Sequence, residues 1–337
     1  MARAISRRRA ISIMAAASGL PLLGAKAASA AMTPVVWHGQ ALGAPATLIL
    51  NHPDRAKAER LIDRVVAEVG RLEAIFSLYR ETSTLCELNR VGGLAAPPAE
   101  FVELLEACRV AWRTSKGAFD PTVQPLWTLY ARHFASSGMD PAGPALQDIE
   151  DARSRIGFDA VHFNSHRIVF TRPHMALTLN GIAQGYVTDR VVDLLKAEGV
   201  TNSLINMGES RALGPKADGA SWKVKLAETE VGGGSDIIID LVDKAVATTS
   251  STGFHFDGAG RFGHILDPRE EAVPPFNYRR VTTIAPTATI ADALSTAFSL
   301  MDEASIRTTV AHDPSIIVDL VDVNGSHMQL NRSSVRV

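Results

Sequence analysis

The chain contains few cysteines, and their spacing excludes two common classes of small protein. Only Cys86 and Cys108 occur among 337 residues, with no C-x-x-C or histidine-rich pattern, so neither a disulfide framework nor a zinc-finger site is expected. Whether these two thiols pair stays open. An oxidising compartment would allow a disulfide, whereas Cys108 falls on the apolar side of a helical run, where a buried thiol is equally well explained.

The chain also lacks an excess of basic charge. Five of its 34 Lys and Arg residues lie within residues 1–30, which contain no acid, so the remainder has 29 basic against 36 acidic residues and a net charge of about −7. A nucleic-acid partner would need a basic face, and none is expected here. Beyond residue 30 no apolar stretch approaches the roughly 20 residues of a transmembrane helix, so no membrane span is expected there.

Residues 1–30 have the composition of an export signal. Arg7, Arg8 and Arg9 precede a modest apolar run, and Ala28-Ser29-Ala30 supplies the small residues of a cleavage site. Paired arginines indicate the twin-arginine route, which predicts a periplasmic protein. An uncleaved membrane anchor is the alternative, but the apolar run is interrupted by Ser18, Gly19 and Pro21 and is short for a bilayer.

Hydrophobic periodicity predicts an α+β protein. Helical spacing predicts helices over residues 55–76, 85–89, 100–115, 147–156, 182–197, 290–301 and 303–311. Short β-like runs predict strands over 161–164, 167–170, 176–179, 203–206, 222–226, 237–242, 245–249, 281–285, 316–321 and 327–330. Helices dominate the first half and strands the second, which favours α+β over a doubly wound parallel sheet. Residues 31–337 are expected to form one domain.

A carboxylate and a hydroxyl stand four residues apart near the C-terminus, at Asp292 and Thr296, with Ser295 between them. Positions i and i+4 share one face of a helix, and a small hard cation such as Mg²⁺ prefers oxygen ligands presented together. The alternative is ordinary helix capping, because Asp and Ser often accept hydrogen bonds from the N–H groups at a helix start.

Three further segments carry chemistry. In residues 178–189 a predicted strand is followed by glycines and then by a predicted helix. The free N–H groups at the helix start could bind an anion. Tight packing of the strand against the helix explains the glycines equally well. This turn is neither G-x-G-x-x-G nor a P-loop. Residues 117–123 place Phe119 and Asp120 on a turn after a helix. Residues 264–269 join His264, whose imidazole titrates near neutral pH, to an acidic turn, although a lone histidine is more often structural.

Together and in this order, the segments resemble the ApbE family of FAD:protein FMN transferases over nearly the whole chain beyond residue 30. The segments that carry the resemblance are residues 76–83, 88–89, 117–122, 180–189, 206–214, 247–250, 264–268 and 285–296. The paired-arginine leader, with the segment 178–186, is similar to the NosX subgroup associated with nitrous-oxide respiration. The resemblance implies a mixed, two-lobed, T-fold-related domain with antiparallel-rich sheets and flanking helices.

The resemblance also implies a reaction and residue roles. The family cleaves FAD at its pyrophosphate, attaches FMN to a Thr or Ser of a partner flavoprotein, and releases AMP. By resemblance, Asp292, Ser295 and Thr296 with the carbonyl of Gly181 hold Mg²⁺, and His264 is the general base toward the acceptor hydroxyl. Asp292 is thereby also expected to be catalytic. The residues matching flavin-nucleotide contacts are Leu42 (usually Met in the family), Tyr79, Ala118, Phe119, Asp120, Thr178, Gln184 and Ile265.

The chain departs from the family pattern at several positions. Thr178 stands where the family often has Asp, and Gln184 where it has Lys or Glu. Glu209 replaces the second of two glycines, and Glu270-Glu271 replaces Thr-Gly in the turn after His264. Two alternative functions therefore stay open: an FAD pyrophosphate hydrolase that gives FMN and AMP, and a non-catalytic periplasmic FAD carrier.

Overall fold

The computed structural model describes residues 34–226, 237–269 and 277–334. The expected export signal, residues 1–30, lies outside the described residues, as do Glu270 and Glu271. In the part of the chain that is described, no helix combines the length and apolar character needed to cross a bilayer.

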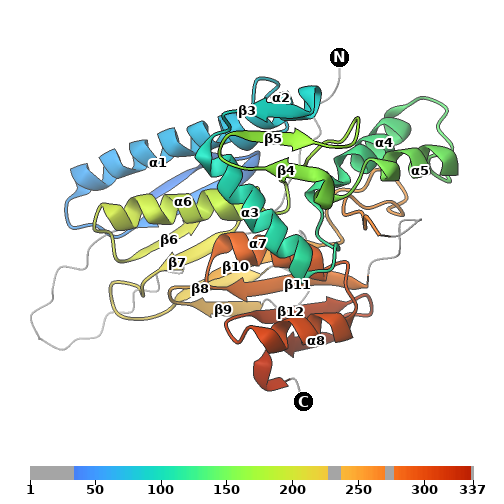
Figure 1. Cartoon of the computed structure of the whole chain (residues 1–337). Helices are drawn as coiled ribbons and strands as arrows, with labels where there is room; N and C mark the ends of the chain where they lie inside the picture. The colour runs from blue at the N-terminus through green and yellow to red at the C-terminus, as the bar shows by residue number, and fades with distance from the viewer. Residues whose placement is uncertain (1–33, 227–236, 270–276, 335–337) are drawn as a thin grey trace, which may run out of the picture.

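One large antiparallel sheet organises the molecule (Figure 1). Its strands, in spatial order, are β1 (Val35–Ala41), β2 (Ala44–Leu50), β6 (Ser203–Asn206), β7 (Ser210–Leu213), β10 (Ala245–Ser250), β11 (Tyr278–Ala285), β12 (Ile317–Asp322) and β13 (His327–Leu330). Two small antiparallel sheets accompany it: β3 (Gly93–Ala95), β5 (Arg167–Phe170) and β4 (Val161–Phe163), and the hairpin β8 (Trp222–Leu226) and β9 (Ile237–Leu241).

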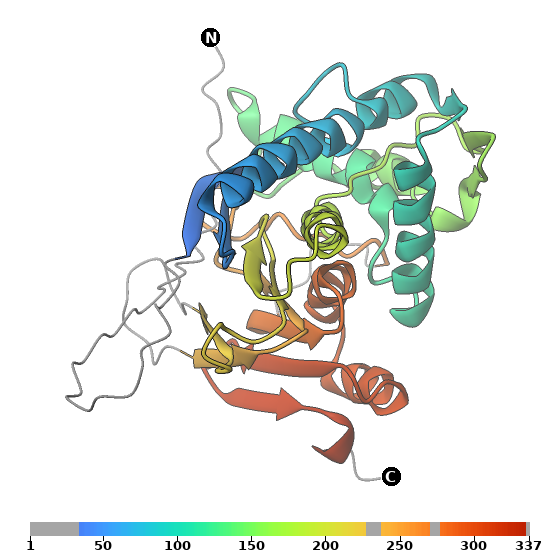
Figure 2. The same ribbon diagram turned by 90° about the vertical axis from the view of Figure 1, so that its left-hand side faces the viewer.

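The described residues form eight α-helices, most of which lie on one face of this sheet. They are α1 (Arg55–Phe76), α2 (Thr84–Val91), α3 (Ala99–Thr114), α4 (Gln124–Ala135), α5 (Leu146–Ser154), α6 (Ala183–Ala197), α7 (Ala288–Phe298) and α8 (Glu303–His312). Figure 2 looks nearly along α6 and α7, which lie side by side, with α3 standing beside them on the right. The opposite face is covered in part by the β8–β9 hairpin, whose Trp222 and Val224 pack against Leu204 and Val246 of the sheet.

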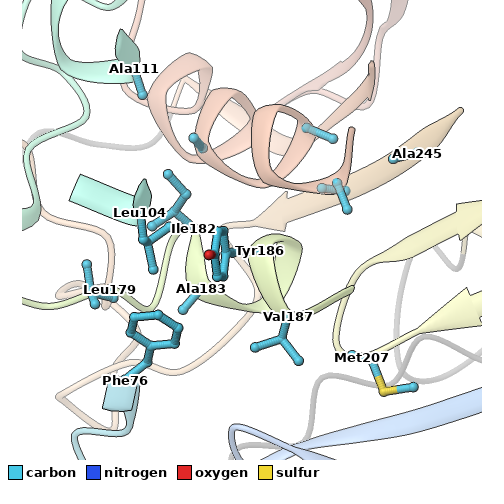
Figure 3. Close-up of a cluster of buried hydrophobic side chains, with 14 of the residues drawn as sticks. Phe76, Leu104, Ala111, Leu179, Ile182, Ala183, Tyr186, Val187, Met207 and Ala245 are labelled. Atoms are coloured by element: carbon cyan, nitrogen blue, oxygen red, sulfur yellow. The ribbon is translucent and has the colours of Figure 1, made fainter. Parts of the chain in front are cut away.

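The start of α6 lies at the centre of the main core. Figure 3 shows Ile182, Ala183 and Tyr186 of this region beneath α7 and beside Phe76 and Leu104. The rings of Phe76 and Tyr186 meet edge to face at 5.6 Å between centroids. Since α6 is enclosed by α1, α3, α7 and the sheet, its first turn is held on several sides.

A smaller lobe of α4, α5 and the loop of residues 254–266 has its own core, and we call it the aromatic lobe. Leu126, Tyr130 and Ile149 of the helices are buried there with Leu266 of the loop. Ring contacts join the two parts, and these are Trp127–Phe254, Trp127–Phe256, Tyr130–Phe256, Tyr130–Phe262 and Phe134–Phe262. The expected α+β class with two lobes and antiparallel sheets is confirmed.

Most predicted elements are present with small shifts at their ends. The helix over 55–76 and the strands over 203–206, 222–226 and 327–330 have the predicted bounds. Asp54 caps the first of these by accepting a hydrogen bond from Lys57 N–H at 3.0 Å. The β1–β2 hairpin, β7 and α4 were not predicted.

One predicted strand is wrong. Residues 176–179 are extended but pair with no strand. The side-chain amide of Asn89 takes the place of a neighbouring strand, donating to Leu177 O at 2.8 Å and accepting from Leu177 N–H at 2.7 Å. Thr178 N–H donates instead to Pro121 O at 2.7 Å. The apolar alternation of Leu177 and Leu179 therefore marked burial correctly, but not sheet pairing.

Candidate active site

Two adjoining pockets bring together all of the sequence-predicted site residues except Asp292 and Ser295. The first is lined by Leu42, Gly43, Ala44, Phe76, Ser77, Leu78, Tyr79, Asn180, Ala183 and Gln184. The second is lined by Ala118, Phe119, Asp120, Pro121, Val123, Trp127, Thr178, Asn180, Gly181, Thr249, His264, Ile265, Leu266, Thr296 and Leu300. Asn180, at the turn before α6, belongs to both linings, so the pockets meet at that turn.

Leu42 forms one wall of the first pocket from a two-residue hairpin turn. Leu42 and Gly43 have φ of 48° and 79°, as a turn between antiparallel strands with the usual twist requires. Such a conformation is uncommon for leucine. Glu73 of α1 supports it by accepting a hydrogen bond from Leu42 N–H at 2.7 Å.

Tyr79 and Gln184 stand on other walls of the first pocket. Tyr79 is 59% exposed, on the loop between α1 and α2, where an aromatic ring is open to a ligand. Gln184 is buried, and its side chain lies against Gly208 so closely that a Cβ on Gly208 would fall 2.6 Å from Gln184 Cδ. Gly208 also has φ of 111°, so both space and backbone require glycine there.

Asp120 is fixed at the base of the second pocket by several donors. Its Oδ1 accepts from Thr122 N–H at 2.8 Å and from the Thr122 hydroxyl at 2.5 Å, and its Oδ2 accepts from Phe158 N–H at 3.1 Å. Burial raises the pKa of the Asp120 carboxyl above its ordinary value, against the lowering effect of these donors. Thr178 lines the same pocket, with its hydroxyl accepting from Asn180 N–H.

His264 is presented to the second pocket by the aromatic lobe. Its N–H donates to Phe254 O at 3.1 Å, and its ring Nδ1 lies 2.7 Å from the same carbonyl oxygen. A carbonyl can only accept, so Nδ1 carries the proton in this contact and Nε2 is left as the basic nitrogen of a neutral ring. Gly253 makes room for the ring, because a Cβ there would lie 2.7 Å from His264 Cε1.

The turn after His264 connects the aromatic lobe to the end of α7. Asp267 is buried and accepts two hydrogen bonds from the guanidinium of Arg269, at 2.9 and 2.6 Å. Arg269 also donates to Leu300 O at 2.7 Å. Ile265 and Leu300 therefore face the same pocket from two lobes that this arginine holds together.

Thr296 lies close to Gly181 in the lining of the second pocket. A Cβ on Gly181 would lie 3.0 Å from Thr296 Oγ1, so any side chain there would press on that hydroxyl. Asp292, one turn earlier on α7, is buried and accepts Gly185 N–H at 3.0 Å. Gly181 and Thr296 therefore line the second pocket together, while the Asp292 carboxylate, one turn earlier, is buried beside it and lines neither pocket. Carbonyl, hydroxyl and carboxylate oxygens are the ligands that a hard cation prefers.

The structure gives Ser295 a different environment from Thr296. Its buried hydroxyl lies 2.8 Å from Thr249 Oγ1 and donates to Asp292 O at 3.0 Å, so it bonds α7 to β10. Ser295 belongs to neither pocket lining, whereas Thr249 does line the second pocket. Within the described ranges there is no cluster of three or more His, Cys, Asp or Glu side chains suited to a metal.

The structure partly answers whether Asp292 is a helix cap rather than a metal ligand. Thr287 is the N-cap of α7, with its side chain accepting Ile290 N–H, and Asp292 lies in the fifth position of the helix. Asp292 does cap a helix, but that helix is α6, through Gly185 N–H. A ligating carboxylate whose other contacts are hydrogen bonds is the usual arrangement around a metal, so capping and ligation are compatible.

Asn180, Trp127 and Thr249 were not assigned roles from the sequence, yet all three line the second pocket. Asn180 stands in the predicted strand-to-helix turn, so its position was a usable signal. Trp127 belongs to a helix that the sequence did not reveal.

Cys86 and Cys108 are both free thiols, so they do not pair. Cys108 is fully buried, and burial raises the pKa of its thiol. The Cys86 thiol lies toward the carbonyl oxygens of Ser77 and Leu78.

One departure from the family pattern, Glu209, lies at a turn of the large sheet. Glu209 is buried at the β6–β7 turn, where its carbonyl accepts the Thr188 hydroxyl at 3.0 Å and its carboxylate accepts Thr248 N–H at 3.3 Å. The extra carboxylate of Glu209 therefore bonds to strand β10, and Glu209 lines neither pocket.

Comparison with known proteins agrees with this architecture. The model of the ApbE family matches residues 42–318, and the chain belongs to that family. Proteins named FAD:protein FMN transferase are 25% identical over 74% of this chain and 74% of the relative in Haemophilus influenzae, and 29% identical over 72% of each in Vibrio cholerae. The apo crystal structure of Pseudomonas stutzeri flavinyl transferase ApbE superposes with a TM-score of 0.76 at 26% identity, covering 89% of this chain and 96% of that one.

Proposed function

We propose that this protein is a magnesium-dependent FAD:protein FMN transferase that attaches FMN to a Thr or Ser of a partner flavoprotein and releases AMP. One observation carries the proposal: two pockets meet at Asn180, and His264, Gly181 and Thr296 all line the second. A long dinucleotide needs such a continuous site. The names of the relatives in Haemophilus influenzae and Vibrio cholerae support this substrate.

The residues fit the proposed chemistry. The acceptor hydroxyl oxygen forms a bond to the FMN phosphorus, the pyrophosphate bond to AMP breaks, and the hydroxyl proton passes to Nε2 of His264. Asp292, Thr296 and the Gly181 carbonyl would hold Mg²⁺, which neutralises charge on the pyrophosphate when bound. Phe119, Ile265 and Trp127 supply apolar and aromatic walls, and Tyr79 an exposed ring for a planar base.

The cellular setting is also part of the proposal. The paired arginines and the Ala28-Ser29-Ala30 site support export by the twin-arginine route and cleavage after Ala30, with residues 31–337 forming the periplasmic enzyme. Similarity of the leader to the NosX subgroup supports a membrane flavoprotein of nitrous-oxide respiration as the acceptor.

The deciding experiment incubates the protein with FAD, Mg²⁺ and a candidate acceptor. We expect a fluorescent acceptor band that survives denaturation, with AMP released in equal amount, and no band when the acceptor Thr or Ser is replaced by Ala. AMP and FMN formed equally well without acceptor would identify a hydrolase instead. Tight FAD binding without AMP under any condition would identify a carrier.

A further inference from the structure

Helices α6 and α7 pack side by side (Figure 2), and we call their contact, residues 181–189 against 288–296, the α6–α7 seam. Gly181 lies against Thr296, Gly185 N–H bonds to Asp292, and Asp189 bonds to Ala288 N–H. The three contacts stand four residues, or about 6 Å, apart along α6, and they reach Thr296, Asp292 and Ala288 in turn on α7. The seam therefore has a defined alignment at three successive turns.

The two helices exchange carboxylate caps across this seam. Asp292 of α7 accepts the first-turn N–H of Gly185 in α6 at 3.0 Å. Asp189 of α6 accepts Ala288 N–H at 2.9 Å, Thr289 N–H at 2.8 Å and the Thr289 hydroxyl at 2.6 Å. The first N–H groups of a helix have no partner within it, and a carboxylate there is also favoured by the helix dipole.

Asp189 is itself fixed from the sheet. Arg211 of β7 donates to its Oδ1 at 2.5 Å, and the two side chains are only 12–13% exposed. A buried carboxylate with several charged and backbone donors cannot change position without leaving those donors unpaired. The start of α7 is thereby tied through Asp189 to both α6 and β7.

Close helix contact makes this register strict. A Cβ at Gly185 would lie 2.2 Å from Ala288 O, so the backbone of α6 at Gly185 touches the start of α7. A slip of one turn would move Thr296 about 6 Å from Gly181. Mg²⁺ accepts little deviation from octahedral geometry, and binding groups need placement to within about 0.5 Å.

We propose that Asp189 is a positioning residue for the cation site: it sets the register of α7 against α6 and so holds Asp292 and Thr296 opposite Gly181. This inference rests on the proposed role of Asp292 and Thr296 in metal binding. Asp189 touches neither substrate nor cation. Its effect passes through the backbone of Ala288 and Thr289 to residues one and two turns further along α7.

The test compares Asp189→Asn with Thr287→Ala in the full chain. Thr287 caps the same end of α7 through Ile290 N–H but makes no bond to α6 in the described contacts, so it is the matched control for helix-end stability. Mn²⁺ binding is measured by electron paramagnetic resonance in the presence of ADP, which supplies a diphosphate without turnover. We expect Asp189→Asn to weaken Mn²⁺ binding roughly ten- to hundred-fold, as for other residues that orient ligands, and Thr287→Ala to leave it within about two-fold.

Two more variants keep the outcome clear. Asp292→Asn tests the cation site itself: unchanged Mn²⁺ affinity in this variant rejects the proposed metal role. If Asp292→Asn weakens Mn²⁺ binding but Asp189→Asn and Thr287→Ala bind Mn²⁺ equally well, the metal role of Asp292 stands and the positioning role of Asp189 is rejected. If Asp189→Asn does not fold, Thr289→Val, which removes only the 2.6 Å hydroxyl bond, must still weaken Mn²⁺ binding several-fold, and unchanged binding overturns the inference.

Discussion

The two sides of the second pocket are built on different physical principles. On one side, the α6–α7 seam positions oxygen atoms through buried carboxylates and backbone N–H groups at fixed spacing. On the other, the aromatic lobe presents His264 on a loop held by ring packing around Phe256. Hydrogen bonds are directional, whereas apolar packing is not. A cation needs its ligands at strict positions, and the directional hydrogen bonds of the α6–α7 seam suit that need. A proton acceptor tolerates larger changes in position, so the aromatic packing of the lobe is sufficient for His264.

The largest expected effect comes from removing the carboxylate of the seam. Asp292→Ala should lower FMN transfer about a hundred- to a thousand-fold, because a cation that neutralises pyrophosphate charge contributes several kcal/mol to the barrier. The rate of fluorescent acceptor formation at saturating FAD measures this. Asp302→Ala, which removes the N-cap of α8, is the control and should retain activity. Equal activity in both variants would contradict the role of the seam.

The next largest effect is expected on the aromatic-lobe side of the second pocket. His264→Asn keeps a donor for Phe254 O but removes the basic nitrogen, so transfer should fall about a hundred-fold or more while Mn²⁺ binding is unchanged. His255→Asn is the control, since His255 lies in the same loop and in neither pocket lining. Loss of Mn²⁺ binding in His264→Asn would show that the two sides are not separable.

A smaller effect is expected from the packing that carries His264. Phe256→Ala removes ring contacts with Trp127, Tyr130 and Phe254. Since Phe256 is only half-buried, we expect a loss of about 1–3 kcal/mol in unfolding free energy and a several-fold lower transfer rate, with Mn²⁺ affinity retained. Chemical denaturation and the gel assay measure these. Phe163→Ala, in the small sheet, should destabilise without this selective loss of rate.

The smallest effect concerns Asp120 between the two sides. Burial raises its pKa above the ordinary value of 3.8, so the folded protein holds the proton more tightly than the unfolded chain. That contribution to stability is complete below the unfolded pKa and is lost as pH rises through the folded pKa. Asp120→Asn should therefore gain stability relative to the original chain as the pH rises above the ordinary carboxyl pKa of 3.8, measured by Tm. A Tm difference independent of pH would show that the carboxyl is not desolvated.

Local patterns were sufficient where an element is defined by its own residues. The helix 55–76 has a full apolar stripe and a capping Asp54, and its bounds were predicted without error. Helix α4 was missed because its start follows the Asp120-Pro121 turn, which masks the helical pattern. The extended segment 176–179 was predicted as a strand because its alternation reflects burial, while its actual partner is the side chain of Asn89, 88 residues away from Leu177.

The sequence by itself determined the residue types of the site and their order: His264, the Asp292–Thr296 pair and the glycine turn before α6. It also determined the family, because several short motifs occur together. Only the tertiary structure decided that Ser295 bonds to Thr249 while Thr296 faces Gly181, and that Asp189 and Asp292 exchange caps. Spacing along one helix fixes which residues share a face, but the register between two helices depends on contacts between residues about a hundred positions apart.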